Sequence, residues 1–299
     1  MPEPPPIGSA PLLGHPPDAR LLIVNADDLG MSTAINVAIM AAIDDGITRT
    51  CSLMPPCRAA AHAVGLLRDR TDVPFGIHLT LVCDSVDEPW GPLSAPAEVP
   101  SLLAGTGALV GPARVCELLA RARIEDVERE FRAQIRAVLD TGLTPSHLDW
   151  HCLLDGGRAD VFDLTVELAE EHGLAVRAWS DRGRRELRER GSPVTEHPFL
   201  DSFALDPDGK AAHYAGLLRG LPPGLSEWAV HPGPDGPPSR ADDRDQRVRA
   251  TDRAFLTSPQ AHAIVREEGI VLTDHRAVQQ AWARSLDLLD RRAAPDGCG

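Results

Sequence analysis

Five acidic or imidazole side chains stand at or near the ends of short apolar runs in this chain: Asp27, Asp28, His78, His147 and His231. Apolar runs of this length are typical of strands buried in a parallel sheet. Because the carboxyl ends of parallel strands converge on one face of a barrel, we expect these side chains to lie close together. One carboxylate and two imidazoles can hold a divalent metal and leave positions open for water and substrate. With a second carboxylate as general base and a further histidine as general acid, such a site could hydrolyse an amide.

The adjacent Asp27 and Asp28 allow two interpretations when taken alone. Successive residues of a regular strand point to opposite faces, so both carboxylates reach one site only if the chain turns there. Gly30 and a candidate helix N-cap at Ser32 indicate such a turn. The alternative is that one aspartate merely caps the following helix. The histidines further along the chain favour the site over the cap.

The segment 145–151 carries His147, Asp149 and His151 at intervals of two residues, so all three project to the same side of a strand. Three polar side chains that face a barrel interior are costly unless something binds them. A solvated edge strand is the alternative, and Leu148 together with the helical flanks disfavours it.

Aromatic side chains adjoin these candidates, although only 4% of the chain is aromatic. Their placement suggests stacking on the face of a sugar, and ordinary core packing explains each of them at least as well. An arginine two positions before one of the tryptophans would face the same way. The expected substrate-binding side chains are Asp149, Trp150, His151, Arg177 and Trp179.

The elements that must position these residues are short β-type runs alternating with amphipathic stretches. Seven or eight such units indicate an α/β fold, a TIM-like parallel β/α barrel. We expect one domain at 20–290, a flexible proline-rich arm without helix or paired strand at 1–19, and a flexible tail at 291–299. The expected strands lie near 21–26, 47–53, 74–81, 144–149, 174–179, 225–231 and 269–273. The expected helices lie near 32–45, 57–70, 113–140, 159–172 and the C-terminus, and a helical region is expected from about 242 to 268.

Residues 83–112, rich in proline and glycine, interrupt this alternation. Loops longer than about 12 to 15 residues are usually functional or disordered. This loop follows a strand, so on a barrel it would lie on the C-terminal face, where we expect a substrate lid.

Charge and composition narrow the classes of partner. The formal net charge of −14 over 299 residues disfavours nucleic acid and anionic membranes, which would repel the protein. No apolar stretch approaches the ~18 residues of a membrane helix, and the N-terminus lacks the pattern of a secretory signal, so we expect a cytoplasmic protein. Six cysteines without a C-x-x-C motif indicate neither a disulfide scaffold nor a zinc ribbon. The oligomeric state, including a homo-oligomer, is left open.

Four motifs, taken in order, resemble those of the YdjC-like carbohydrate deacetylases, a family that includes chitooligosaccharide deacetylases and is related to the polysaccharide deacetylases. They are Asn-Ala-Asp-Asp-Leu-Gly at 25–30, Gly-Ile-His-Leu at 76–79, Ser-His-Leu-Asp-Trp-His at 146–151 and Val-His-Pro-Gly at 230–233. The resemblance implies a distorted β/α barrel of the glycoside hydrolase/deacetylase type. It also implies hydrolysis of an N-acetyl group from an amino sugar or short oligosaccharide, with one divalent metal ion, Mg²⁺ or Zn²⁺.

The same resemblance implies a role for each candidate. The metal ligands would be Asp28, His78 and His147, the general base would be Asp27, and the acid would be His231.

The chain departs from many relatives in one motif, since Trp-His-Cys-Leu at 150–153 stands where those relatives have His-Gln-His. Two other functions remain open from the residues. A glycosidase on the same barrel would leave the histidines unused, and adjacent aspartates are poor candidates for two catalytic carboxyls about 5 to 9 Å apart. A non-catalytic sugar-binding protein with a structural metal is the other alternative.

Overall fold

The computed structural model describes residues 8–85, 89–105, 107–234 and 243–293. Eight parallel strands form one sheet in the order β5-β4-β3-β2-β1-β7-β6, with β8 paired to β1. Strands β5 and β6 end this order and do not pair with each other in the described residues, so the sheet forms an incomplete barrel. The expected distorted β/α barrel is therefore confirmed. The strands are β1 Arg20–Leu29, β2 Thr50–Leu53, β3 Phe75–Leu79, β4 His147–Trp150, β5 Ala175–Val176, β6 Leu200–Asp201, β7 Gly224–Val230 and β8 Val271–Thr273.

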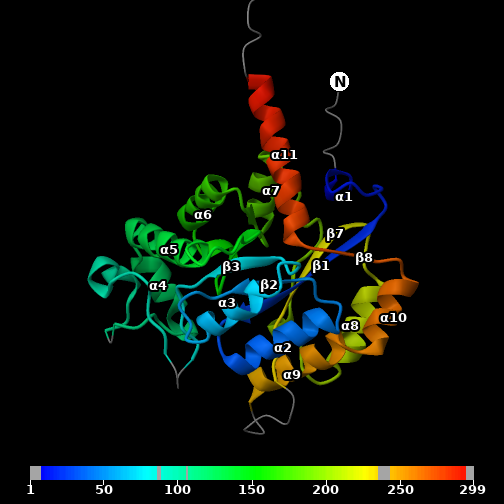
Figure 1. The fold of residues 1–299 in the computed structure, drawn as a ribbon, viewed down its shortest axis with the longest axis horizontal. Helices are drawn as coiled ribbons and strands as arrows, with labels where there is room; N and C mark the ends of the chain where they lie inside the picture. The colour runs from blue at the N-terminus through cyan, green and yellow to red at the C-terminus, as the bar shows by residue number, and fades with distance from the viewer. Residues whose placement is uncertain (1–7, 86–88, 106, 235–242, 294–299) are drawn as a thin grey trace, which may run out of the picture.

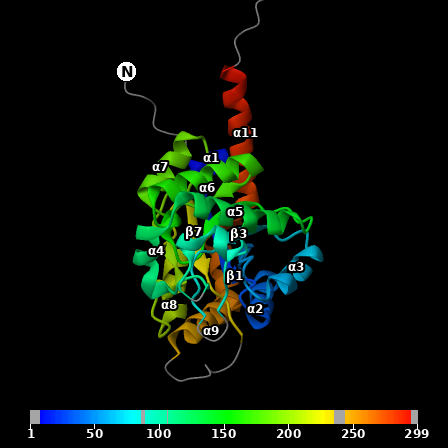
Figure 2. The same cartoon turned by 90° about the vertical axis from the view of Figure 1, so that its left-hand side faces the viewer.

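Helices surround this sheet, and Figure 2 shows β1, β3 and β7 between α5 and α6 on one side and α2 and α9 on the other. Figure 1 shows α11 extending beyond the rest of the fold. The α-helices are α1 Ser9–Leu12, α2 Thr33–Asp44, α3 Ala60–Arg68, α4 Val115–Arg121, α5 Ile124–Leu139, α6 Ala159–His172, α7 Asp181–Glu189, α8 Lys210–Arg219, α9 Arg244–Leu256, α10 Pro259–Glu267 and α11 His275–Ala293. The 3-10 helices are η1 Pro96–Glu98, η2 Pro100–Leu102, η3 Pro112–Arg114, η4 Leu154–Gly156 and η5 Ser202–Ala204.

Strand β1 lies in the interior of the sheet and pairs with three other strands, so its neighbours change along its length. On one side it pairs with β7; on the other it pairs with β8 along Leu21–Ile23 and then with β2 from Asn25 to Leu29. Leu21 and Ile23 pack in one apolar cluster, while Leu22 and Val24 belong to the other. Because both faces are buried, the carboxyl end of β1 is held firmly where the candidate aspartates stand.

Two expectations about helices are wrong. The helix expected over 113–140 is two helices, α4 and α5, because Ala122 and Arg123 adopt extended backbone and the Ala122 carbonyl accepts a hydrogen bond from Arg158 instead. The arm expected to lack helix contains α1, whose Ser9 hydroxyl donates to the Val194 carbonyl at 2.6 Å. Pro11 is tolerated there because the first helical turn needs no N–H from it.

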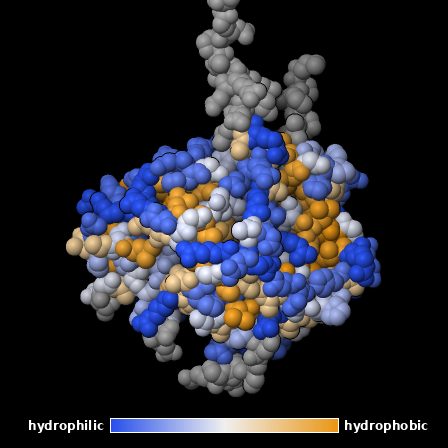
Figure 3. Space-filling view, viewed as in Figure 1, coloured by the Kyte–Doolittle hydropathy of each residue, from blue (hydrophilic) through white to orange (hydrophobic). Residues whose placement is uncertain are grey.

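The ends of the chain lie partly outside the described residues, at 1–7 and 294–299. Helix α11 continues to Ala293, so its backbone includes the first three residues of the expected tail. Polar and charged side chains cover most of the face seen in Figure 3, with apolar groups near its centre and to the right of α11. No helix in the described ranges is long and apolar enough to cross a membrane.

The long loop at 83–112 leaves the carboxyl end of β3, as expected, and contains η1 and η2. Glu130 of α5 accepts hydrogen bonds from the backbone N–H groups of Leu93 and Ser94, both at 2.9 Å. Trp90 is buried, and its indole N–H donates to the Val82 carbonyl at 3.1 Å. These contacts tie the loop to the barrel beside the candidate site.

Candidate active site

Asp27 and Asp28 both face the candidate site because β1 contains a bulge. The register between β1 and β2 shifts between Ala26 and Leu29, and Asp28 has a φ of 73°. Aspartate tolerates this left-handed backbone better than most residues do. The bulge is the turn that the sequence required, and neither aspartate caps α2, whose N-cap is Ser32.

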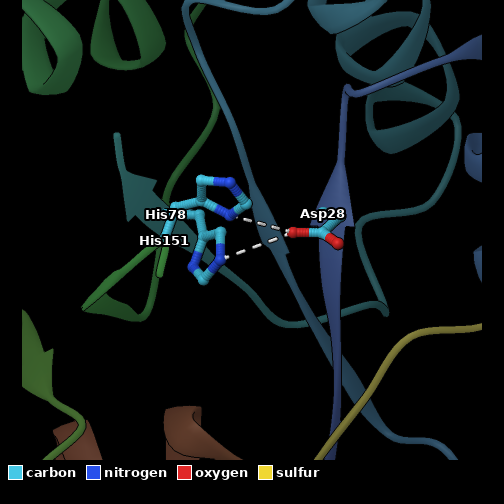
Figure 4. A group of neighbouring side chains, drawn as sticks. All are labelled: Asp28, His78 and His151. Atoms are coloured by element: carbon cyan, nitrogen blue, oxygen red, sulfur yellow. Dashed lines mark ion pairs between the residues drawn. The ribbon is translucent and has the colours of Figure 1, made fainter. Parts of the chain in front are cut away.

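Asp28, His78 and His151 form a group that fits a divalent metal ion (Figure 4). Asp28 Oδ1 lies 3.7 Å from His78 Nε2 and 3.2 Å from His151 Nδ1. Ligands of one tetrahedral ion stand about 3.3 to 3.6 Å apart. Asp28 Oδ1 is buried and receives no well-aligned hydrogen bond from the described residues, which leaves it available to a cation.

The charge around His151 supports the same conclusion. Burial lowers the pKa of His151, but Cys152, Asp28 and Asp84 outweigh burial and hold that pKa well above its usual 6.5. A position that stabilises a buried proton among anionic groups also suits a metal cation, which competes with that proton for the ring nitrogen.

His147 is not part of this group, because it lies at the start of β4, farther from the carboxyl ends of the strands. Its ring stacks on His275 with centroids 3.8 Å apart, and its Nδ1 lies 3.0 Å from Ser146 Oγ. Burial and the neighbouring His275 lower the pKa of His147 to about 4. The ring fits only because residue 76 is glycine, since a Cβ there would lie 2.4 Å from it. The structure thus places His147, the expected ligand, apart from Asp28. His151 is the histidine that lies next to Asp28 and His78.

The spacing of residues 147–151 could have indicated that His151, and not His147, lies next to Asp28. Residues 147, 149 and 151 point the same way, and only His151 lies beyond the end of β4, nearest the carboxyl face. Its backbone N–H donates to the Leu79 carbonyl at 3.0 Å, which continues the sheet pairing to this position. Asp149, one step lower, is fully buried and lies 2.9 Å from His78 Nδ1, so it orients that ring.

Asp27 is paired with Arg177 directly beside the candidate metal ligands. Arg177 donates to both carboxylate oxygens at 2.9 and 2.8 Å, while Asp27 Oδ2 lies 3.9 Å from His78 Nε2. Burial raises the pKa of Asp27, but Arg177 and His78 together outweigh burial and lower it overall. Asp149 and Glu227 also contact Arg177, at 2.9 and 2.8 Å. Arg177 is 1% exposed, so it does not reach the cavity surface. It orients the acidic side chains of the site and does not contact a ligand in the cavity.

His231 stands at the end of β7 on the wall of the same cavity. Its Nδ1 lies 2.8 Å from Ser202 Oγ, and its backbone N–H donates to Asp252 Oδ2 at 2.8 Å. The buried Lys210 and Tyr214 hold the other oxygen of Asp252, at 2.5 and 2.8 Å. With Nδ1 occupied, Nε2 is the ring nitrogen left to act on a substrate.

A cavity of about 940 Å³ opens over these groups, within the upper range for small-molecule sites. Trp179 lines it, and its ring stacks on Phe199 with centroids 3.7 Å apart. Trp150 also borders the cavity, but it is 3% exposed and its indole N–H donates to Thr165, so it acts mainly in packing. Trp90, from the long loop, is a further lining residue that the sequence did not single out.

Arg249 of α9 is another residue that sequence reasoning missed. Its Nη2 lies 2.6 Å from Asp28 Oδ2, so the oxygen of Asp28 that faces away from the two histidines is paired. Burial raises the pKa of Asp28, but Arg249 and the two neighbouring histidines, His151 and His231, hold it well below its usual range. No local pattern distinguishes this arginine from the others in the same arginine-rich helix.

The chain is similar to proteins of one family and shares its fold with a solved structure. A family model described as YdjC-like protein matches residues 21–267. A carbohydrate deacetylase from Geobacillus stearothermophilus is 32% identical over 86% of this chain and 97% of its own length. A carbohydrate deacetylase from Brevibacillus brevis is 35% identical over 61% of this chain and 68% of its own length. A solved Enterococcus faecalis protein, named for a role in cellobiose-phosphate cleavage, shares the fold, with a TM-score of 0.71 at 22% identity over 87% of this chain and 98% of its own.

Proposed function

Because this chain belongs to the YdjC-like family, we propose that it is a metal-dependent carbohydrate deacetylase, which removes the acetyl group from an N-acetylated amino sugar or short oligosaccharide. The observation that carries the proposal is the arginine-paired Asp27 beside the group of Asp28, His78 and His151, on a cavity that His231 also lines.

Asp28, His78 and His151 would hold one divalent metal. The donor set of one oxygen and two nitrogens suits Zn²⁺ better than Mg²⁺, which prefers oxygen ligands. When bound, the metal would supply Lewis acidity, polarising the acetyl carbonyl and lowering the pKa of water. His147 would not be a ligand of this metal, because its ring lies against Ser146 and His275.

Asp27 would act as the general base. Its carboxylate is held ionised by Arg177, so it can accept a proton from the attacking water at neutral pH. His231 would act as the general acid: with Nδ1 bound to Ser202, the protonated ring can deliver the Nε2 proton to the departing amine nitrogen. Trp179 offers an aromatic surface for the sugar.

The test is a screen of N-acetylated mono-, di- and oligosaccharides, with acetate and the sugar chain measured in the same sample. We expect acetate with an intact sugar chain, loss of release after a chelator, and recovery when Zn²⁺ or Mg²⁺ is returned. Cleavage of the glycosidic bond would instead identify a glycosidase. Calorimetric binding of the sugar without any product would identify a non-catalytic sugar-binding protein.

A further inference from the structure

Asp84, His151 and Cys152 form a second group of candidate metal ligands at the edge of the cavity. His151 Nε2 lies 3.3 Å from Cys152 Sγ and 3.5 Å from Asp84 Oδ2, and the three ligand atoms all lie within 4.8 Å of one another. Sulfur, nitrogen and oxygen ligands of one tetrahedral zinc ion stand about 3.3 to 3.6 Å apart. A single ion could therefore be held by these side chains after a small movement of Asp84 or Cys152.

We propose that Asp84, His151 and Cys152 bind a soft divalent cation, Zn²⁺ or Cd²⁺, at a site distinct from that of Asp28 and His78. A thiolate ligand selects such cations over Mg²⁺ and Ca²⁺, which prefer oxygen. On binding, a cation–sulfur bond forms and the Cys152 thiol proton passes to water. Cys152 and Asp84 are both exposed, so the cation can enter from the cavity without opening the core.

His151 belongs to both groups through opposite ring nitrogens. Its Nδ1 faces Asp28, whereas its Nε2 faces Cys152 and Asp84. A neutral imidazole offers one lone pair, because its other nitrogen carries the proton. A cation on Nε2 therefore leaves Nδ1 protonated and removes His151 from the first group. When excess Zn²⁺ places a second ion on Nε2 while the first ion stays on Asp28 and His78, the first ion has lost one ligand and the enzyme is inhibited. This inhibition rests on the function proposed above, whereas cation binding does not.

The direct test follows thiolate-to-cadmium absorption in the ultraviolet as Cd²⁺ is added to the full chain. Of the described free cysteines, Cys116 and Cys152 are exposed, and Cys298 lies outside the described residues. A Cys116→Ser/Cys298→Ser chain therefore serves as the background. We expect it to develop the band as Cd²⁺ is added, and we expect the band to disappear when Cys152→Ser is added. A band that persists at full strength in that triple variant would overturn the proposal.

Two single substitutions in the same background separate the sites. Asp84→Asn keeps the thiol and is expected to need at least about tenfold more Cd²⁺ for half-saturation, since one ligand is lost. Asp28→Asn is expected to keep the band, because Asp28 belongs only to the first group. Loss of the band in Asp28→Asn, with the thermal unfolding midpoint and circular dichroism unchanged, would show that no separate site exists.

The inhibition is measured by titrating Zn²⁺ against acetate release, with each variant compared with its own rate at low metal. We expect half-inhibition of the Cys152→Ser chain to require at least about tenfold more Zn²⁺ than the background chain does. Equal sensitivity would refute competition for His151. If no substrate is turned over, the proposed function fails. The cadmium band still tests whether Asp84, His151 and Cys152 bind a cation, because it does not depend on activity.

Discussion

Arg177 donates to both carboxylate oxygens of Asp27, from Nη1 at 2.9 Å and from Nη2 at 2.8 Å. This two-pronged pair fixes the orientation of Asp27 and lowers its pKa, against the effect of burial. Asp149 and Glu227 contact the same guanidinium, so Asp27 belongs to a buried network of three carboxylates around Arg177. The network explains how a carboxylate can remain ionised while 2% exposed.

Asp27→Asn should abolish most of the catalytic rate, because an amide cannot accept the proton from water. The expected fall in kcat is about 10²- to 10⁴-fold, the usual worth of a general base. The metal ligands are untouched, so metal content by elemental analysis should equal that of the unsubstituted chain. Turnover at the original rate would rule out Asp27 as the base.

His151→Ala and His147→Gln should differ in metal retention. His151 lies 3.2 Å from Asp28 Oδ1, whereas His147 stacks on His275 below the group. We expect the first variant to bind Zn²⁺ at least about tenfold more weakly and the second to keep its affinity, both measured by competition with a chelating dye. The reverse result would restore His147 to the ligand set.

Ser202→Ala should affect the acid step alone. Without the hydroxyl at 2.8 Å, His231 loses the partner that fixes its ring and directs Nε2 to the leaving group. Release of acetate from an N-acetylated sugar should fall, whereas an activated aryl acetate, whose leaving group needs no proton, should be hydrolysed at nearly the original rate. Ser202→Thr, which keeps a hydroxyl, is expected to recover amide hydrolysis.

An equal loss with both substrates in Ser202→Ala would indicate a structural effect instead. The ratio of the two rates is therefore the quantity to compare, together with the thermal midpoint of each variant.

His147 should make the protein less stable as pH falls from about 6.5 to about 4. Its folded pKa is lowered to about 4 from 6.5, so within this range the unfolded chain binds the proton and the folded chain does not. The free energy of unfolding therefore decreases as pH falls, by up to about 3 kcal/mol in total. Urea unfolding at pH 6.5 and at pH 4 measures this loss.

His147→Gln should show a smaller loss of unfolding free energy across the same pH range. His213→Gln, at an exposed position, is the matched control and should behave like the unsubstituted chain. An identical pH dependence in all three proteins would contradict the assignment of this stability change to His147.

The sequence by itself determined the barrel class, most strand positions and the residue types at the strand ends. Local patterns suffice for this, because apolar runs of strand length and the N-cap at Ser32 depend on near neighbours. It also identified Asp27, Asp28, His78 and His231, which the structure places around one cavity.

Only the tertiary structure decided which histidine accompanies Asp28 and His78. The choice between His147 and His151 depends on height along the barrel axis, which follows from the register of β3 with β4 and from the end of β4 at Trp150. The pairings of Arg177 with Asp27 and of Arg249 with Asp28 join residues 150 and 221 positions apart. Such contacts leave no periodic pattern in the chain, because they arise only when distant strands and helices close around the same cavity.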